Sequence, residues 1–126
     1  GGNGVVKAFY PNGAKSAEIT FKDSEMNGPF TLYHPNGKPM IEAVFDAGYL
    51  QGKRKTYFAS GALQKEEQFE AGSRFGTHIT YAPNGTVLAS ENFHANEMHR
   101  TNSYFAPDGK PVSTQTFYYG ILLNSK

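Results

Sequence analysis

The chain has 126 residues, of which 38% are apolar and 14% are Phe or Tyr, and its formal net charge is +1. This length suits a single domain, and the balanced charge excludes the strongly basic surface that attracts nucleic acid or anionic membranes. The absence of cysteine excludes disulfides, thiolate metal sites and a cysteine nucleophile. No apolar run approaches the roughly 18 residues that span a bilayer, so we expect neither a transmembrane segment nor a nucleic-acid partner.

The first predicted element is a turn at residues 10–13, with the sequence YPNG, and near copies of it follow at 34–37, 58–61, 82–85 and 106–109. Proline suits the first central position of a type I turn, Asn or Asp suits the next, and glycine takes the left-handed position that follows. The pattern therefore predicts five hairpin turns. Their glycines are spaced by 24 residues without insertion or deletion, at Gly13, Gly37, Gly61, Gly85 and Gly109.

Two columns of aromatic residues keep the same register. Four residues before the turn glycines stand Phe9, Tyr33, Tyr57, Tyr81 and Phe105. Eight residues after them stand Phe21, Phe45, Phe69, Phe93 and Phe117. The columns lie on opposite arms of each predicted hairpin, and we expect alternation to place both on one face, where cross-strand aromatic pairs stabilise a sheet.

A second turn is expected after each of these phenylalanines, within residues 22–28, 46–52, 70–76 and 94–100, and glycine bounds the first three of these segments. Two strands per repeat predict an all-β fold, an elongated and twisted antiparallel meander of about ten strands in a single domain over residues 1–126. The chain begins Gly1-Gly2-Asn3-Gly4 without methionine, so we expect a trimmed N-terminus. The location stays open between secreted, periplasmic or cell-envelope sites and the cytoplasm.

Recurring carboxylates are the first candidates for chemistry. Glu18, Glu42 and Glu66 stand five residues after a turn glycine, and Glu91 stands six after one. One repeat corresponds to roughly 10 Å across two strand spacings, beyond the separation that carboxylate pairs use in glycoside hydrolysis. No nucleophile elbow or phosphate-binding loop is present. We therefore expect a solvated polar face, no enzyme and no cofactor.

The third repeat holds a basic run, Lys53-Arg54-Lys55, next to Tyr57 and Phe58. Such a run could form a stacking platform for single-stranded nucleic acid, but the pattern favours the solvated edge of a sheet. Residues 60–69 are rich in strong helix formers. Their register with the neighbouring repeats predicts instead a strand that is polar on its outward face.

The four histidines fall in different columns. His34 lies in a turn copy and His78 in a strand, while His94 and His99 flank the second turn of the fourth repeat. Together with Glu97, the last two could bring imidazoles and a carboxylate to a metal. The spacing is not that of a zinc site, so we expect exposed loop histidines and no metal.

The segment 117–123, FYYGILL, is the most apolar window of the chain. At the end of an open sheet it would present an unpaired strand edge and exposed apolar side chains. This predicts an interface with another chain. Its candidate residues are Tyr118, Tyr119, Ile121, Leu122 and Leu123.

An aromatic residue, a PNG turn, a polar strand ending in Phe and a glycine-bounded second turn together resemble the variant MORN repeat. This variant is common in bacterial proteins, including a group of YwqK-like antitoxins. The resemblance extends from Gly4 to about Leu122 and implies a sheet of repeated hairpins that serves as a scaffold or binding module, not an enzyme. The better-known MORN repeat carries tryptophan in its core motif, which this chain lacks, so its lipid docking is not carried over.

The favoured hypothesis is a repeat scaffold that mediates protein–protein interaction. Two alternatives stay open: an antitoxin or immunity-like role against a toxin, and a carbohydrate-binding or cell-envelope surface. The second would use exposed tyrosines, for which the candidates are Tyr49, Tyr104, Tyr118 and Tyr119. Self-association through the terminal edges of the sheet is a further expectation.

Overall fold

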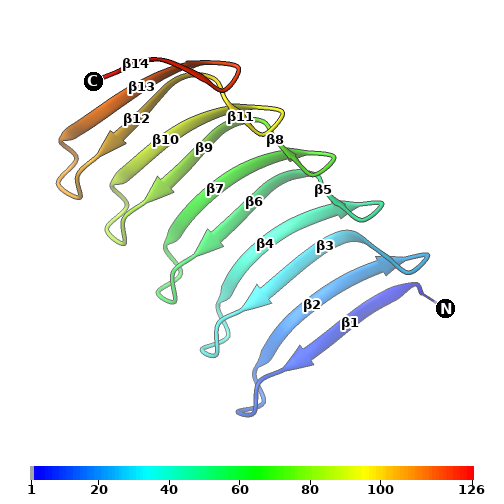
Figure 1. The fold of residues 1–126 in the computed structure, drawn as a ribbon. Helices are drawn as coiled ribbons and strands as arrows, with labels where there is room; N and C mark the ends of the chain where they lie inside the picture. Colours follow the sequence, from blue (N-terminus) through cyan, green and yellow to red (C-terminus); the bar gives the residue numbers. More distant parts are fainter. Residues whose placement is uncertain (1) are drawn as a thin grey trace.

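The structure is a computed structural model that describes residues 2–126, and it places them in one open antiparallel sheet without helices in that range. Figure 1 shows the strands side by side along one axis, with the two termini at opposite ends of the sheet. The predicted all-β meander is confirmed. Its strands are β1 (Gly4–Phe9), β2 (Lys15–Lys22), β3 (Glu25–Tyr33), β4 (Pro39–Asp46), β5 (Tyr49–Leu50), β6 (Gly52–Tyr57), β7 (Leu63–Glu70), β8 (Ser73–Arg74), β9 (Gly76–Tyr81), β10 (Val87–His94), β11 (Glu97–Met98), β12 (Arg100–Phe105), β13 (Pro111–Tyr118) and β14 (Ile121–Ser125).

The sheet has fourteen strands where the sequence predicts about ten. Eleven of them follow one another across the sheet, while the two-residue strands β5, β8 and β11 pair only with β4, β7 and β10. These short strands arise because a single residue, such as Gln51 between β5 and β6, interrupts the arm after the second turn. The last strand, β14, is added because the chain continues past Phe117 into one more arm.

The first turns form as the sequence predicts. In the first copy the Gly13 N–H donates to the Tyr10 carbonyl at 2.9 Å, and the Tyr10 N–H donates to the Ala14 carbonyl at 2.8 Å. All five turn glycines have φ between 88° and 97°. Only glycine adopts this left-handed conformation without steric cost, which explains why Gly61 persists where Pro and Asn are replaced.

The second turns lie in the first half of the predicted segments, directly after the phenylalanine arms. Each is a two-residue turn with positive φ at both positions, such as Ala47 (47°) and Gly48 (86°), as in the type I′ turns that match the twist of hairpins. The glycines expected to bound these turns are strand residues: Gly28, for example, lies opposite Phe45 in the ladder between β3 and β4. Glycine recurs there because φ is positive, at 105° for Gly28 and 79° for Gly52.

The expectation that both aromatic columns share a face is wrong. Gly28 lies opposite Phe45, and Tyr33 is five residues further along the same strand. An odd separation in a strand places side chains on opposite faces. We call the side that carries Phe21, Phe45, Phe69, Phe93 and Phe117 the Phe face, and the opposite side the Tyr face.

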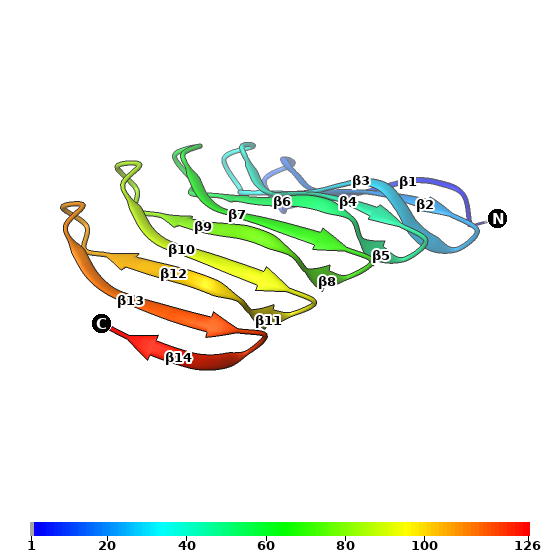
Figure 2. The same cartoon turned by 90° about the horizontal axis from the view of Figure 1, so that it is seen from above.

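The sheet is a single curved layer (Figure 2) and has a small apolar core. The buried apolar residues are Ala43, Phe69 and Ala82. Along the middle of the Phe face, the side chains change from apolar in the first two repeats to polar in the later three. In chain order this row contains Val6, Ile19, Phe30, Ala43, Arg54, Glu67, His78, Glu91, Asn102 and Gln115.

Neighbouring repeats are also joined at their second turns. The Gly48 N–H donates to the Met26 carbonyl at 2.9 Å, and the Gly72 N–H donates to the Leu50 carbonyl at 2.9 Å. At most of these junctions a column of polar side chains adds a second bond. The Ala47 N–H donates to Asn27, the Ala71 N–H to Gln51 and the Tyr119 N–H to His99, over 2.9–3.0 Å.

Candidate binding surface

A buried charged network occupies the Phe face of the third and fourth repeats. Glu67 is only 2% exposed. Its Oε1 accepts a hydrogen bond from Arg54 Nε at 3.1 Å and forms an ion pair with Arg54 Nη2 at 3.0 Å. The Arg54 guanidinium also lies over the ring of Phe69, 4.9 Å from its centroid. This corrects the prediction of a solvated strand edge for residues 53–55, because β6 lies inside the sheet between β4 and β7. The strand at residues 60–69 was expected to be polar on its outward face, yet its Glu67 is buried, because Arg54 and His78 lie against its carboxylate.

His78 continues this network toward the C-terminus. It is 4% exposed and lies between two phenylalanines, with ring centroids 5.9 Å from Phe69 and 4.6 Å from Phe93. Its Nδ1 is 3.9 Å from Glu67 Oε2, and its Nε2 is 3.0 Å from the Gln68 carbonyl. Burial lowers the pKa of the His78 imidazole below 6.5, although the Glu67 carboxylate and the backbone contacts act in the opposite direction.

The lowered pKa of His78 predicts a loss of stability in acid. The folded chain holds His78 neutral, whereas the unfolded chain binds a proton below about pH 6.5, so stability falls as the pH drops through the folded-state pKa. Urea unfolding at pH 8, 7, 6 and 5 should show a steeper decline for the natural chain than for His78→Gln. Parallel curves for the two proteins would contradict this assignment.

The recurring carboxylates fasten neighbouring strands. On the Tyr face, Glu42 accepts a 2.6 Å hydrogen bond from Tyr57 Oη, and Glu66 pairs with Lys53 Nζ at 2.8 Å. On the Phe face, Glu91 accepts a 2.9 Å bond from Tyr104 Oη. Burial and the neighbouring carboxylate raise the pKa of Tyr57, and likewise of Tyr104, to about 12.

Glu18 on β2 makes similar contacts with a lysine and a tyrosine. Its carboxylate lies 3.0 Å from Lys15 Nζ, and Tyr33 Oη is 3.5 Å away. The hydrogen bond with Lys15 lowers the pKa of Glu18. Each of the four recurring carboxylates therefore contacts a lysine or a tyrosine. These contacts stabilise the sheet, and none of the four carboxylates is left without a partner.

The structure separates His34 from the other histidines and brings His94 and His99 together. His34 Nε2 bonds to the Tyr57 carbonyl at 2.9 Å, across to the next repeat. The rings of His94 and His99 are 6.3 Å apart, and both contact Tyr119. Among residues 2–126, no group of three His, Asp or Glu side chains is placed to hold a metal ion.

A hollow of about 330 Å³ opens beside these two histidines. Its wall includes Phe75, Thr77, Asn92, His94, His99 and Arg100. The sequence analysed above does not predict this hollow. The sequence contains one indication of it: at several of the wall positions the residue type differs from that in the same column of the other repeats.

The largest exposed apolar surfaces lie at the two ends of the sheet. All five residues predicted for the C-terminal interface are exposed, from 44% at Tyr119 to 64% at Leu123. The N-terminal strand β1 exposes Val5, Val6 and Phe9 by 52–61%, residues that the sequence analysis did not name as an interface.

The tyrosines considered for carbohydrate binding do not form one surface. Tyr118 and Tyr119 are in edge-to-face contact, with centroids 4.7 Å apart. Tyr49 is exposed beside the second turn of an earlier repeat. Tyr104 is half-buried and bonded to Glu91, so its expected exposure is wrong.

The described residues contain no helix that is long and apolar enough to cross a membrane. A family model described as MORN repeat variant matches residues 3–23, 26–47 and 50–71. No curated protein matches the chain. Each matched segment is one hairpin around a first turn, and together the segments cover just over half of the sequence. MORN repeats generally bind proteins or membranes and form a non-enzymatic repeat fold. The chain belongs to the family of MORN repeat variants.

Proposed function

We propose that the chain is a non-enzymatic scaffold that binds another protein through the C-terminal edge of its sheet. The observation that supports this is the composition of β14 and the turn before it. Ile121, Leu122 and Leu123 are exposed by 51–64%, and β14 pairs with β13 on one side only. Unpaired strand edges with apolar side chains bind further strands readily.

The direction of the strands favours a second copy of the chain as one such partner. Every pairing is antiparallel and the path across the sheet has eleven strands, so β1 and β14 run in the same direction. An antiparallel ladder between two copies therefore joins like edges, β14 with β14, around a two-fold axis. β1 carries Lys7, whereas β14 has no charged side chain, and charge protects edges from pairing.

Light scattering after gel filtration tests this edge. The natural chain is expected to form dimers as its concentration rises, and Leu122→Lys combined with Leu123→Lys is expected to remain monomeric. The matched control, Val5→Lys with Val6→Lys, alters the opposite edge and should dimerise like the natural chain. Identical monomers of the natural chain and the β14 variant at all concentrations would exclude self-association there.

An antitoxin-like role is a narrower form of the same proposal. It would place a toxin on the β14 edge, and the same pair of lysine substitutions would weaken the complex with a candidate toxin. A carbohydrate surface is favoured only at Tyr118 and Tyr119, the one place where two exposed tyrosines meet. We further propose that residues 1–126 act as a single domain, because each hairpin makes its hydrogen bonds to the hairpins on either side.

A further inference from the structure

The hollow beside His94 and His99 is built from residues that break the internal repeat. In the polar column that joins neighbouring repeats, Asn27, Gln51 and His99 each accept a backbone hydrogen bond. The same column holds Phe75 in the third repeat. Phenylalanine cannot make that bond, and its ring lines the hollow instead.

Arg100 is a second departure, in the column of strand glycines. Its φ is 67°, close to the 71° of Gly76 and the 79° of Gly52, which occupy the same column in earlier repeats. A side chain is strained in this conformation, and strained residues concentrate at functional sites. Arg100 also lines the hollow. Phe75 and Arg100, which both differ from the residue type of their column without a gain in stability, therefore border the same space.

Arg100 is the formally charged residue among those that line the hollow. Within residues 2–126, Arg100 forms no salt bridge. The carboxyl of Glu97, the nearest acid in sequence, lies against Gly120 on the next second turn. A free guanidinium binds a carboxylate through two parallel hydrogen bonds.

Aromatic rings and a hydrogen-bonded amide make up much of the rest of the wall. The rings of Phe75 and His94 meet edge to face at 5.2 Å. Asn92 is fixed by bonds from Thr77 Oγ1 at 2.7 Å and to the Thr101 carbonyl at 2.8 Å. Flat rings pack well against such walls, and about 330 Å³ is near the lower limit for ligand sites.

We propose that this hollow binds a carboxylate carried beside a flat apolar ring, with Arg100 as the anion-binding residue and Phe75 and His94 as the ring-binding walls. The proposal goes beyond the protein interface at β14 and uses none of its exposed leucines. The ligand is either a free aromatic acid or the C-terminal aromatic residue of a peptide, since both present the same chemistry.

Titration of the full chain with N-acetylphenylalanine, followed by the amide signals of residues 75–77, 92–94 and 99–101, tests the proposal. Saturable shifts at these residues are expected, with at least tenfold weaker binding of N-acetylphenylalanine amide and of acetate. A peptide ending in glycine and phenylalanine distinguishes the two sources: tighter binding than N-acetylphenylalanine assigns the site to a chain terminus, and equal binding assigns it to a free acid.

Arg100→Gly separates binding from folding. It restores the glycine of the column, so the thermal midpoint should stay the same or rise while affinity for N-acetylphenylalanine falls at least tenfold. Lys110→Ser removes one exposed cation elsewhere and should bind like the natural chain. Phe75→Asn should also lose affinity while it restores the column residue. The proposal is overturned by the absence of saturable shifts, by equal affinity for the amide, or by full binding in Arg100→Gly.

Discussion

Replacement of Phe69 by alanine is expected to lower the free energy of unfolding by about 3–5 kcal/mol, the range for large-to-small changes at buried aromatic sites. Phe69 is 6% exposed. Its ring lies under the Arg54 guanidinium at 4.9 Å and beside the His78 ring at 5.9 Å. Because a single layer offers few side chains that could move into the space, the cavity should remain open. Urea unfolding measures the change.

Phe9→Ala is the matched control for this substitution. Phe9 belongs to the other aromatic column and is 61% exposed on the terminal strand β1. Its loss should cost less than about 1 kcal/mol, since exposed positions away from the core change stability little. Equal effects of Phe9→Ala and Phe69→Ala would show that the Phe face is not the more closely packed side of the sheet.

Arg54→Ala is expected to have the second largest effect, about 2–3 kcal/mol. Removal of one partner leaves a buried charge without compensation, which costs about 3–5 kcal/mol for fully buried pairs. The Arg54 side chain is 31% exposed, so water screens part of the interaction and the expected loss is smaller. Chemical denaturation of the variant measures it.

Two further variants isolate the cause. Arg54→Met combined with Glu67→Leu replaces both charges by apolar groups of similar size, and should recover most of the stability lost in Arg54→Ala. Lys53→Ala removes the neighbouring cation, whose pair with Glu66 is exposed, and should change stability by less than about 1 kcal/mol. A double variant as unstable as Arg54→Ala would show that the unpaired Glu67 carboxylate is not the cause of the loss.

The turns and strands were predictable because the requirements for them are local. Gly13 and its copies need a left-handed backbone, and this need recurs with the period of the hairpin. The same periodicity identified residues 63–70 as strand β7 against their helix preference, because pairing with β6 and β9 outweighs intrinsic propensity.

The assignment of faces was not predictable in the same way. The face of a side chain depends on whether the number of residues between Tyr33 and the residue opposite Phe45 is odd or even. The predicted segment for the second turn, residues 22–28, was too broad to fix that number. Burial of Glu67 was missed because charged residues are mostly exposed. The pairing of Arg54 with Glu67 becomes visible only once β6 and β7 are in register.

The columns carried part of the signal for the hollow. Phe75 and Arg100 each replace a residue type that the other repeats keep for a structural reason. The columns do not reveal, however, that both residues border the same space. That proximity follows from the inter-repeat pairing of β9, β10 and β12.

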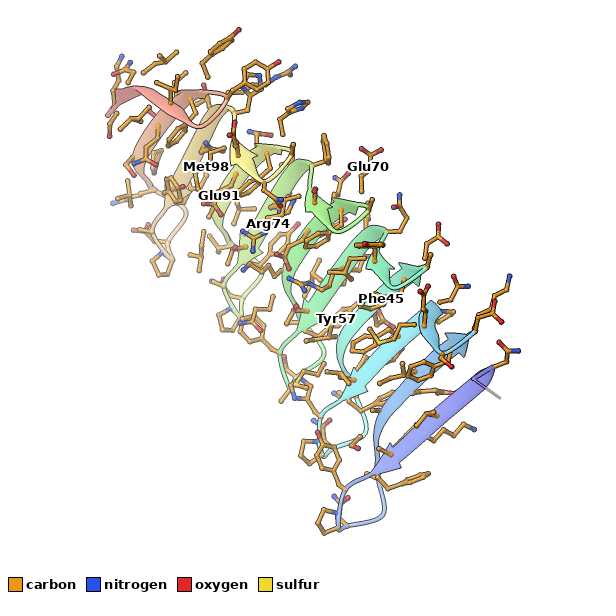
Figure 3. All side chains as sticks on the ribbon, turned by 45° about the vertical axis from the view of Figure 1, so that its right-hand side comes forward. Phe45, Tyr57, Glu70, Arg74, Glu91 and Met98 are labelled. Atoms are coloured by element: carbon orange, nitrogen blue, oxygen red, sulfur yellow. The ribbon has the colours of Figure 1, made fainter. Side chains whose placement is uncertain are left out.

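The termini at opposite ends of the sheet determine how the protein responds to tension. A force applied between them acts along the hydrogen bonds and perpendicular to the strands (Figures 1 and 2). Every ladder carries this force in series, and hairpins peel from the ends, where the outer strand is paired on one side only. Figure 3 shows Glu91, a member of the polar part of the row on the Phe face, inside both ends of the sheet, so it should separate after the terminal hairpins. Among the described residues, the extensive contacts join strands that are neighbours in the sheet. Hairpins should therefore separate one after another at low force. The domain would then act as an extensible tether between partners bound at its two ends.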